Sequence, residues 1–417
     1  MQMYDGLPVT TNKITVEEQQ GIPHHLLGFI GLDEEPWRVG LFKRKASQII
    51  REIRSRGRLP IVVGGTHYYT QSLLFEDALV SDNIGDEEEV QTELSSQEIS
   101  EKFPILDAPP EAILERLREV DPKMANRWHP NDTRRIRRSL EIFLLSGRKA
   151  SDIYAEQREA KSSQTAHLDI EEPYQSASNT LLFWVYSDSN ILKRRLDDRV
   201  DKMLQAGLLN EVESMNGFLV KQIKAGVAVD RTRGIWVSIG WKEFEQYLAA
   251  LQNGTESQEK LEELYELSIE ETKAATRQYA RRQTRWIRLK LMPALSDRNA
   301  LDKLYLLDGS DISLWSDNVS KPAIVTTQDF LAGLELRPPS ELSEAANRLL
   351  GHETPPEDEA IHQECDICNV VCVREQQWQA HLRSRRHRQL LKKRQRNPNG
   401  MSSLPKNDNT SKPPETP

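Results

Sequence analysis

The alternation of apolar and polar residues along the chain predicts an α/β protein. Residues 42–56, FKRKASQIIREIRSR, repeat apolar side chains at helical spacing, and Gly57 ends the repeat. The apolar run at 61–63 then predicts a short buried strand before the turn Gly64-Gly65. A helix, a buried strand and a glycine turn in this order are typical of a parallel sheet, which binds ligands at the carboxyl ends of its strands.

Further elements follow from the same patterns. The apolar runs TLLFWVYS at 180–187 and KLYLL at 303–307 predict two more strands. Helical spacing is found in four more segments, namely 109–127, 132–146, 190–216 and 258–292. The sequence therefore predicts five parts: an α/β core in 1–85 and 180–335, a mainly helical insertion in 86–179, a linker in 336–362, a small module in 363–396 and a disordered tail in 397–417.

The charge of the chain narrows the classes of partner. The net charge of −8 over 417 residues argues against a uniformly basic nucleic-acid binder. The charge is uneven, however, because 86–101 is acidic and 383–396 reads RSRRHRQLLKKRQR. A local basic face of this kind can bind phosphates. No apolar run is long enough to cross a bilayer, and the start does not read as a signal peptide.

The three cysteines lie together and suggest metal binding in a reducing compartment. Two residues separate Cys365 from Cys368, twelve separate Cys368 from His381, and five separate His381 from His387, which is the two-cysteine, two-histidine spacing of a Zn²⁺ site. We expect a hairpin to present the thiolates and one helix face to present the imidazoles. Cys372 is expected to take no part.

Basic side chains after the second histidine and on two other helices suggest an anionic partner. The run from Arg383 to Arg396 suits a phosphate backbone, although a solvated helix end or a nuclear localisation signal would have the same composition. Arg277, Arg281, Arg285 and Arg288 share one helical face, for which the alternative is pairing with nearby glutamates. The helix at 132–146 likewise carries Arg134, Arg135, Arg137 and Arg138.

Six motifs then occur in order: MQMYDGLPVTTNK, GIPHHLLGF, IVVGGTHYY, HPNDTRRIRRSLEIF, LDDRVDKMLQAGLLNEV and TRQYARRQTRWIR. Together they resemble the tRNA dimethylallyltransferases, also called tRNA isopentenyltransferases, from residue 1 to about 290, and the C-terminal C2H2 zinc finger is similar to that of eukaryotic members. The resemblance implies a P-loop NTPase-like core with a parallel sheet and a helical insertion. It also implies transfer of a dimethylallyl group from dimethylallyl diphosphate to N6 of the adenine just 3′ of the anticodon, with the adenine flipped into a channel.

The start of the chain matches the family only in part. The family pattern at the target adenine is Asp-Ser-x-Gln-x-Tyr, of which Gln2 and Tyr4 are present, with Gln2 as the expected adenine contact. The Asp, which is the family's base, would fall before Met1, and the chain has no phosphate loop ending in Gly-Lys-Ser/Thr. We therefore expect that the first strand, the phosphate loop and the base are missing, because of an incomplete gene model, an alternative start or a decayed copy.

Other residues match the family motifs directly. Thr66, after Gly64 and Gly65, resembles the family's substrate-channel threonine, although the glycines would serve a strand-end turn equally well. Arg199 resembles the arginine that faces the diphosphate, with the alternative that it pairs with Asp197, Asp198 or Asp201. Two further segments match. Thr11, Asn12 and Lys13 resemble a loop near the anticodon stem. The motif near the RNA comprises Arg277, Gln278, Arg281, Arg282 and Arg285.

The resulting prediction is a tRNA-modifying prenyl transferase. The resemblance implies Mg²⁺ with the diphosphate beside the structural Zn²⁺, a tRNA anticodon stem-loop as partner, and a monomer without membrane association. The competing hypothesis is a tRNA-binding remnant without catalysis, and a kinase-like P-loop enzyme is a distant third because the loop is absent. Cytoplasm, mitochondrion and nucleus are all compatible locations.

Overall fold

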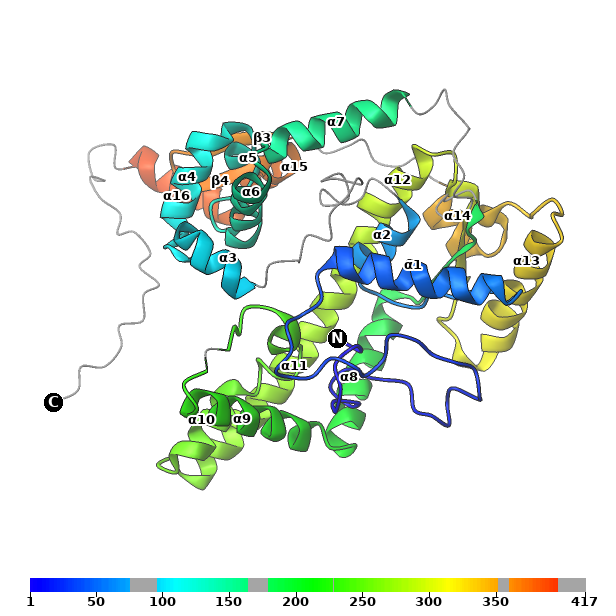
Figure 1. Cartoon of the computed structure of the whole chain (residues 1–417), viewed down its shortest axis with the longest axis horizontal. Helices are drawn as coiled ribbons and strands as arrows, with labels where there is room; N and C mark the ends of the chain where they lie inside the picture. Colours follow the sequence, from blue (N-terminus) through cyan, green and yellow to red (C-terminus); the bar gives the residue numbers. More distant parts are fainter. Residues whose placement is uncertain (76–95, 164–178, 228, 352–359, 397–417) are drawn as a thin grey trace. The chain divides into compact units, whose positions relative to one another are not determined.

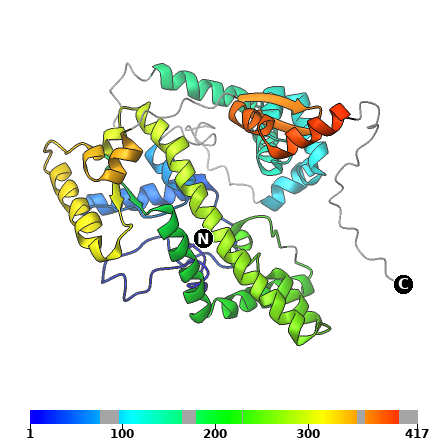
Figure 2. The same cartoon turned by 180° about the vertical axis from the view of Figure 1, so that it is seen from behind.

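The computed structural model describes residues 1–75, 96–163, 179–227, 229–351 and 360–396, and Figures 1 and 2 show it from opposite sides. The chain forms two compact units. We call Met1–Asn83 with Asp169–Pro355 the α/β unit, and Ile84–Leu168 with Pro356–Pro417 the finger unit. The tail predicted to be disordered, 397–417, lies outside the described residues.

A parallel strand pair lies in the α/β unit. Strand β1 (Leu182–Tyr186) pairs with β2 (Leu304–Asp308) from Leu182↔Leu304 to Tyr186↔Asp308, which confirms both of the later strand predictions. The first four residues of β2 are buried, as expected for a strand covered on both faces. The helices of this unit are α1 (Val39–Ser55), α2 (His67–Leu74), α8 (Ser189–Gln205), α9 (Leu208–Lys224), α10 (Glu245–Asn253), α11 (Gln258–Trp286), α12 (Met292–Ser296), α13 (Lys321–Leu331) and α14 (Glu344–Leu350). The fold is thus a helix-rich α/β fold with a parallel sheet.

The strand predicted at 61–63 is wrong in this structure. These residues form no strand, and Ile61, Val62 and Val63 are 76%, 51% and 88% exposed. A strand is stabilised by a neighbour that takes its backbone hydrogen bonds, and none of the described residues pairs with this segment. The apolar run alone was therefore not enough to define a strand.

Local signals explain most helix boundaries. Helix α1 ends where Gly57 takes a φ of +65° and the amide of Arg58 donates to Ile53 O at 3.1 Å. The helix predicted over 190–216 is interrupted at Gly207, whose φ of +101° cannot continue a right-handed helix, so it becomes α8 and α9. The long helix predicted over 258–292 is α11, followed by a π-helical turn, η7 (Ile287–Leu291), and α12.

The linker predicted over 336–362 also needs correction. Residues 344–350 form α14, which Ser343 caps by accepting a hydrogen bond from the amide of Ala346 at 3.0 Å. Ala345 and Ala346 are buried against the core of the β1–β2 pair. A capped helix with an apolar face belongs to the α/β unit, so composition alone misjudged this segment.

The finger unit combines helices with a small hairpin module. The helices before the module are α3 (Ser96–Lys102), α4 (Pro110–Val120), α5 (Pro122–Arg127), α6 (Thr133–Ser146) and α7 (Ala150–Ser163). The module itself contains β3 (Ala360–Cys365), β4 (Val370–Arg374), α15 (Glu375–Leu382) and α16 (Arg385–Arg396), with β3 and β4 antiparallel and β3 against α5. Within the described residues of both units, every helix is too short or too polar to span a bilayer.

Candidate active site and metal centre

The glycine turn 64–66 is docked onto α11. The carbonyl of Gly65 accepts a hydrogen bond from Gln283 Nε2 at 2.7 Å, and Thr66 Oγ1 lies 3.4 Å from the Tyr279 hydroxyl. A Cβ on residue 65 would lie 2.1 Å from Gln283 Nε2, so the contact requires glycine there. The structure therefore brings two separate family motifs, the glycine turn and α11, into direct contact.

Helix α8 is joined to the same helix by ion pairs. Arg277 is paired with Asp197, and Lys273 Nζ lies 2.8 Å from Asp201. Asp197 and Asp201 thus serve α11, and Arg199 makes no ion pair within the described part of the chain. Arg199 is exposed, yet neighbouring protein removes enough water from its guanidinium to lower its pKa. An exposed, partly desolvated cation without a carboxylate partner is suited to an anionic ligand.

The other motif residues of α11 remain available to contact a ligand. Gln278, Arg281, Arg282 and Arg285 are exposed, and the described residues supply none of these arginines with an ion-pair partner. The alternative that they pair with Glu270 and Glu271 is not realised, because Glu270 faces Lys273 at 3.6 Å. Arg277 differs from them, since its charge is already used by α8.

A cavity of about 200 Å³ lies at the carboxyl ends of β1 and β2. Its lining includes Trp184, Tyr186, Trp315 and Thr284, the last from α11. Arg195 also lines it but donates to the carbonyls of residues 309 and 310 at 2.7 and 2.6 Å, so its role there is structural. The position agrees with the expectation that hollows form at this end of parallel strands.

The residues predicted near the adenine, Gln2 and Tyr4, are hydrogen-bonded to the loop predicted near the anticodon stem, Thr11 to Lys13. Gln2 Nε2 donates to Asn12 O at 2.7 Å, Lys13 Nζ donates to Tyr4 O at 2.7 Å, and Thr11 Oγ1 donates to Leu7 O at 2.6 Å. Asn12 stands at a φ of +48°, which asparagine tolerates better than most residues. The side chains of Tyr4 and Thr11 are buried, so in this structure they hold the loop rather than present a surface.

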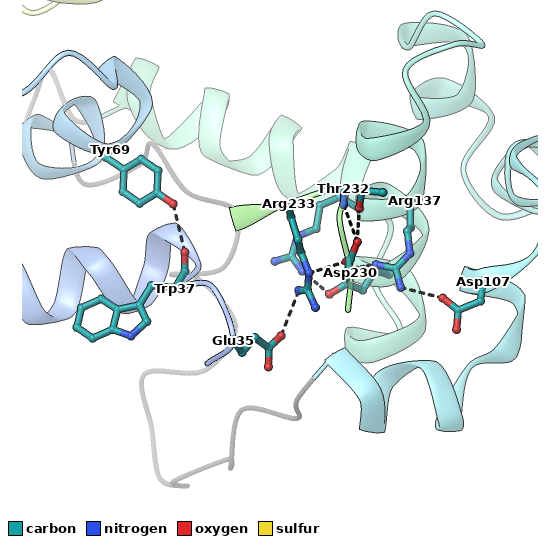
Figure 3. A network of polar contacts seen from close by, with 10 residues as sticks. Glu35, Trp37, Tyr69, Asp107, Arg137, Asp230, Thr232 and Arg233 are labelled. Atoms are coloured by element: carbon teal, nitrogen blue, oxygen red, sulfur yellow. Dashed lines mark hydrogen bonds and ion pairs between the residues drawn. The ribbon is translucent and has the colours of Figure 1, made fainter. Parts of the chain in front are cut away.

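A polar network that the motifs did not predict fixes the neighbouring loops (Figure 3). Arg233 pairs with Glu35 at 3.2 Å and with Asp230 at 2.7 Å, and the Tyr69 hydroxyl donates to Trp37 O at 3.2 Å. Burial pushes the pKa of Asp230 up, but hydrogen bonds from the neighbouring threonine and the charge of Arg233 leave it below its ordinary value. No spacing in the sequence signals a contact between segments this far apart.

In the finger unit the four predicted ligands converge. The ligand atoms of Cys365, Cys368, His381 and His387 all lie within 4.8 Å of one another, and both sulfurs lie 3.5 Å from His387 Nδ1. His381 Nε2 is buried without a hydrogen-bond partner, which is the state expected of a nitrogen that binds metal. Burial lowers the pKa of His381 and so favours the neutral ligand form. Two thiols and two imidazoles at this spacing fit tetrahedral Zn²⁺.

The expectation that one helix carries both histidines is wrong. His381 lies on α15 and His387 on α16, and Ser384 Oγ accepts from the His387 amide at 3.1 Å at the start of the second helix. Six positions along one α-helix turn a side chain by about 240°, so a continuous helix would point the two imidazoles apart. Cys372 is buried in β4 outside the ligand group, as predicted.

The arginine row predicted on α6 is largely neutralised. Arg135 pairs with Asp132 at 3.1 Å, Arg137 with Asp107 at 3.3 Å (Figure 3), and Arg138 with the buried Glu141 at 2.7 Å. These contacts satisfy most of the row within the unit, so it gives weaker support for an anionic partner than the sequence suggested.

The fold and the metal centre define a class, namely helix-rich α/β proteins that contain a parallel strand pair and a C2H2-type zinc module. Comparison with known proteins narrows the class. The profile of the family described as IPP transferase matches residues 2–290, and that of a zinc finger of C2H2 type matches 364–387. The chain belongs to the IPP transferase family.

Individual relatives agree with this assignment. The tRNA dimethylallyltransferase of Schizosaccharomyces pombe is 35% identical over 412 residues, which cover 94% of this chain and 88% of that protein. The enzyme of the same name from Saccharomyces cerevisiae is 35% identical over 414 residues, covering 95% and 85%. A solved structure of a eukaryotic dimethylallyltransferase acting on tRNA matches with a TM-score of 0.71 at 33% identity and covers 95% of this chain and 89% of that one.

Proposed function

We propose that this chain transfers a dimethylallyl group from dimethylallyl diphosphate to N6 of the adenine 3′ of the anticodon in tRNA. The observation that carries the proposal is the docking of the turn 64–66 onto α11, with the unpaired Arg199 on the adjoining α8. The arrangement sets the Thr66 hydroxyl beside Tyr279 and leaves the exposed Arg199 guanidinium for a diphosphate.

The named residues would have separate tasks. As the bond from N6 to the allylic carbon forms, the allylic carbon–oxygen bond breaks and the N6 proton passes to solvent water. Negative charge grows on the departing diphosphate, and the Arg199 guanidinium would stabilise it. Thr66 Oγ1 and the Tyr279 hydroxyl can donate hydrogen bonds to the donor or to the adenine. Arg281, Arg282 and Arg285 would bind phosphates of the anticodon arm and so position the base.

A Mg²⁺ ion with the diphosphate belongs to the same proposal. Apart from the finger ligands, the described residues contain no grouping of three or more His, Cys, Asp or Glu side chains that could hold a metal. The donor's own phosphate oxygens, water and one or two carboxylates would hold Mg²⁺, which is its usual mode of binding beside a substrate phosphate.

The test is incorporation of labelled prenyl group into tRNA by the purified chain, together with tRNA binding. Arg199→Gln should lower the transfer rate by about 100-fold with unchanged tRNA affinity, because it removes a cation that acts on the leaving group. Arg194→Gln is the matched control, since Arg194 is exposed on the same helix and has no ion-pair partner within the described residues. Equal rates in the two variants would contradict the assignment of Arg199.

The same assay separates the two candidate functions. Transfer into wild-type tRNA, lost when the target adenine is replaced by guanine, supports the enzyme. Binding of tRNA by the wild-type chain with no incorporation at saturating donor would support the alternative, a tRNA-binding protein without transfer.

A further inference from the structure

Helix α1 carries a basic face that the proposed site does not use. Its apolar side faces inward, with Ala46 buried and Phe42 packed edge-on against Tyr69, ring centroids 5.0 Å apart. Figure 1 shows α1 beside α2, and the two helices are in contact. The opposite side of α1 therefore points away from α2 and its glycine turn.

That opposite side is strongly positive. Between residues 44 and 58, a stretch that the structure describes in full, the exposed charged residues are Arg44, Lys45, Arg51, Glu52, Arg56 and Arg58. Five of these six are basic, in a chain that has 64 acidic and 56 basic residues overall. A face that serves only solubility mixes both signs, so the excess indicates an anionic partner.

Internal pairing does not account for the charges of Lys45, Arg51 and Arg58. Arg56 lies 3.6 Å from Glu52, and both side chains are more than half exposed, so the pair is weak. Lys45, Arg51 and Arg58 have no ion pair within the described part of the chain. From Lys45 to the end of α1 at Ser55 is about 15 Å along the helix, and Arg58 follows the glycine turn, so these charges can follow a few nucleotides of a backbone.

We propose that the α1 face, defined as the exposed side of the helix that carries Lys45 and Arg51 together with Arg58 just beyond its end, binds the phosphate backbone of tRNA outside the anticodon arm. This inference rests on the proposed function, because it takes tRNA as the substrate. The apolar side of α1 packs against Tyr69 of α2, the helix that follows Thr66, so the exposed side points away from that contact and would meet RNA other than the base that enters beside Tyr279. Such contacts add affinity and orientation without reading sequence.

The test compares two triple variants of the full chain. Lys45→Glu/Arg51→Glu/Arg58→Glu changes the α1 face, and Lys221→Glu/Lys224→Glu/Lys242→Glu makes the same charge change at exposed lysines elsewhere in the α/β unit. Affinity for complete tRNA and for an isolated anticodon stem-loop is measured across a salt series. A third variant, Lys45→Gln/Arg51→Gln/Arg58→Gln, removes the positive charges without adding acids, and so distinguishes loss of charge from unfolding of α1. Circular dichroism checks that each variant is folded.

We expect the α1 variants to bind complete tRNA about 10- to 100-fold more weakly near 0.1 M salt, with a salt slope reduced by about two to three. Their affinity for the stem-loop, and both affinities of the control variant, should stay within about twofold of wild type. Equal losses in the α1 and control variants would overturn the inference and leave the proposed function intact. An equal loss for the stem-loop would also overturn it, by placing the α1 face in the anticodon-arm site. If wild-type protein bound no tRNA, both this inference and the proposed function would fail.

Discussion

Tyr4 offers a sharp test of whether a family-motif residue serves the ligand or the fold. The sequence places it in the adenine-binding turn, whereas its side chain is only 4% exposed and its hydroxyl is hydrogen-bonded to the backbone of Ile235. A Cβ at Gly234 would lie 2.6 Å from that hydroxyl, so the pocket closes tightly around it. We predict that Tyr4→Phe lowers the unfolding free energy by about 1 kcal/mol near neutral pH, the usual net contribution of one hydrogen bond.

The pH dependence adds a second, independent signature. Burial raises the pKa of Tyr4 from 10.0 to about 12. Because the folded-state pKa is the higher one, the stabilisation is complete below pH 10 and is lost as the pH rises toward 12. At about pH 11 the wild type should have lost about 1.4 kcal/mol that Tyr4→Phe cannot lose, which makes the two proteins nearly equal in stability there.

The assay is urea unfolding of both proteins from about pH 8 to about pH 11, with the difference in unfolding free energy plotted against pH. Taking the difference removes titrations that the two proteins share, such as that of Tyr305. A difference that stays constant with pH would refute the linkage argument. Loss of tRNA affinity by tenfold or more with unchanged stability would refute the structural role and restore Tyr4 as a ligand contact.

Three further predictions concern the finger, the glycine turn and the RNA-facing helix. Cys368→Ser should abolish zinc binding, measured as metal content, and weaken tRNA binding. The control variant Cys372→Ser should keep its zinc. Normal zinc content in Cys368→Ser would disprove the ligand assignment. Gly65→Ala should displace the α11 glutamine that bonds its carbonyl, cost about 1 kcal/mol and lower Tm by about 2–4 °C in calorimetry; an unchanged Tm would show that the contact is dispensable. Arg281→Ala/Arg285→Ala should reduce the salt slope of tRNA binding by about two without changing Tm, and a wild-type slope would exclude phosphate contacts there.

The sequence predicted well those features that depend on short-range spacing. The zinc ligands, the parallel strands at 182–186 and 304–308, and the C-terminal end of α1 follow from intervals that physical chemistry constrains directly. Prediction failed where the outcome depends on a distant neighbour. An apolar run at 61–63 becomes a strand only beside a partner, and the arginines of α6 support RNA binding only if acids such as Asp107 do not reach them. The network around Arg233 joins segments almost 200 residues apart, and no local pattern could reveal it.

The break between α15 and α16 has a consequence for how the protein responds to its surroundings. Because His381 and His387 come from different helices, metal coordination fixes the angle between them and thereby the direction in which the exposed side chains of Arg385, Arg386 and Arg388 project. Removal of Zn²⁺ by a chelator would free the angle between α15 and α16 without changing the charge of any arginine. When Zn²⁺ is scarce, the arginines of α16 would thus lose their fixed direction, while the α/β unit remains folded.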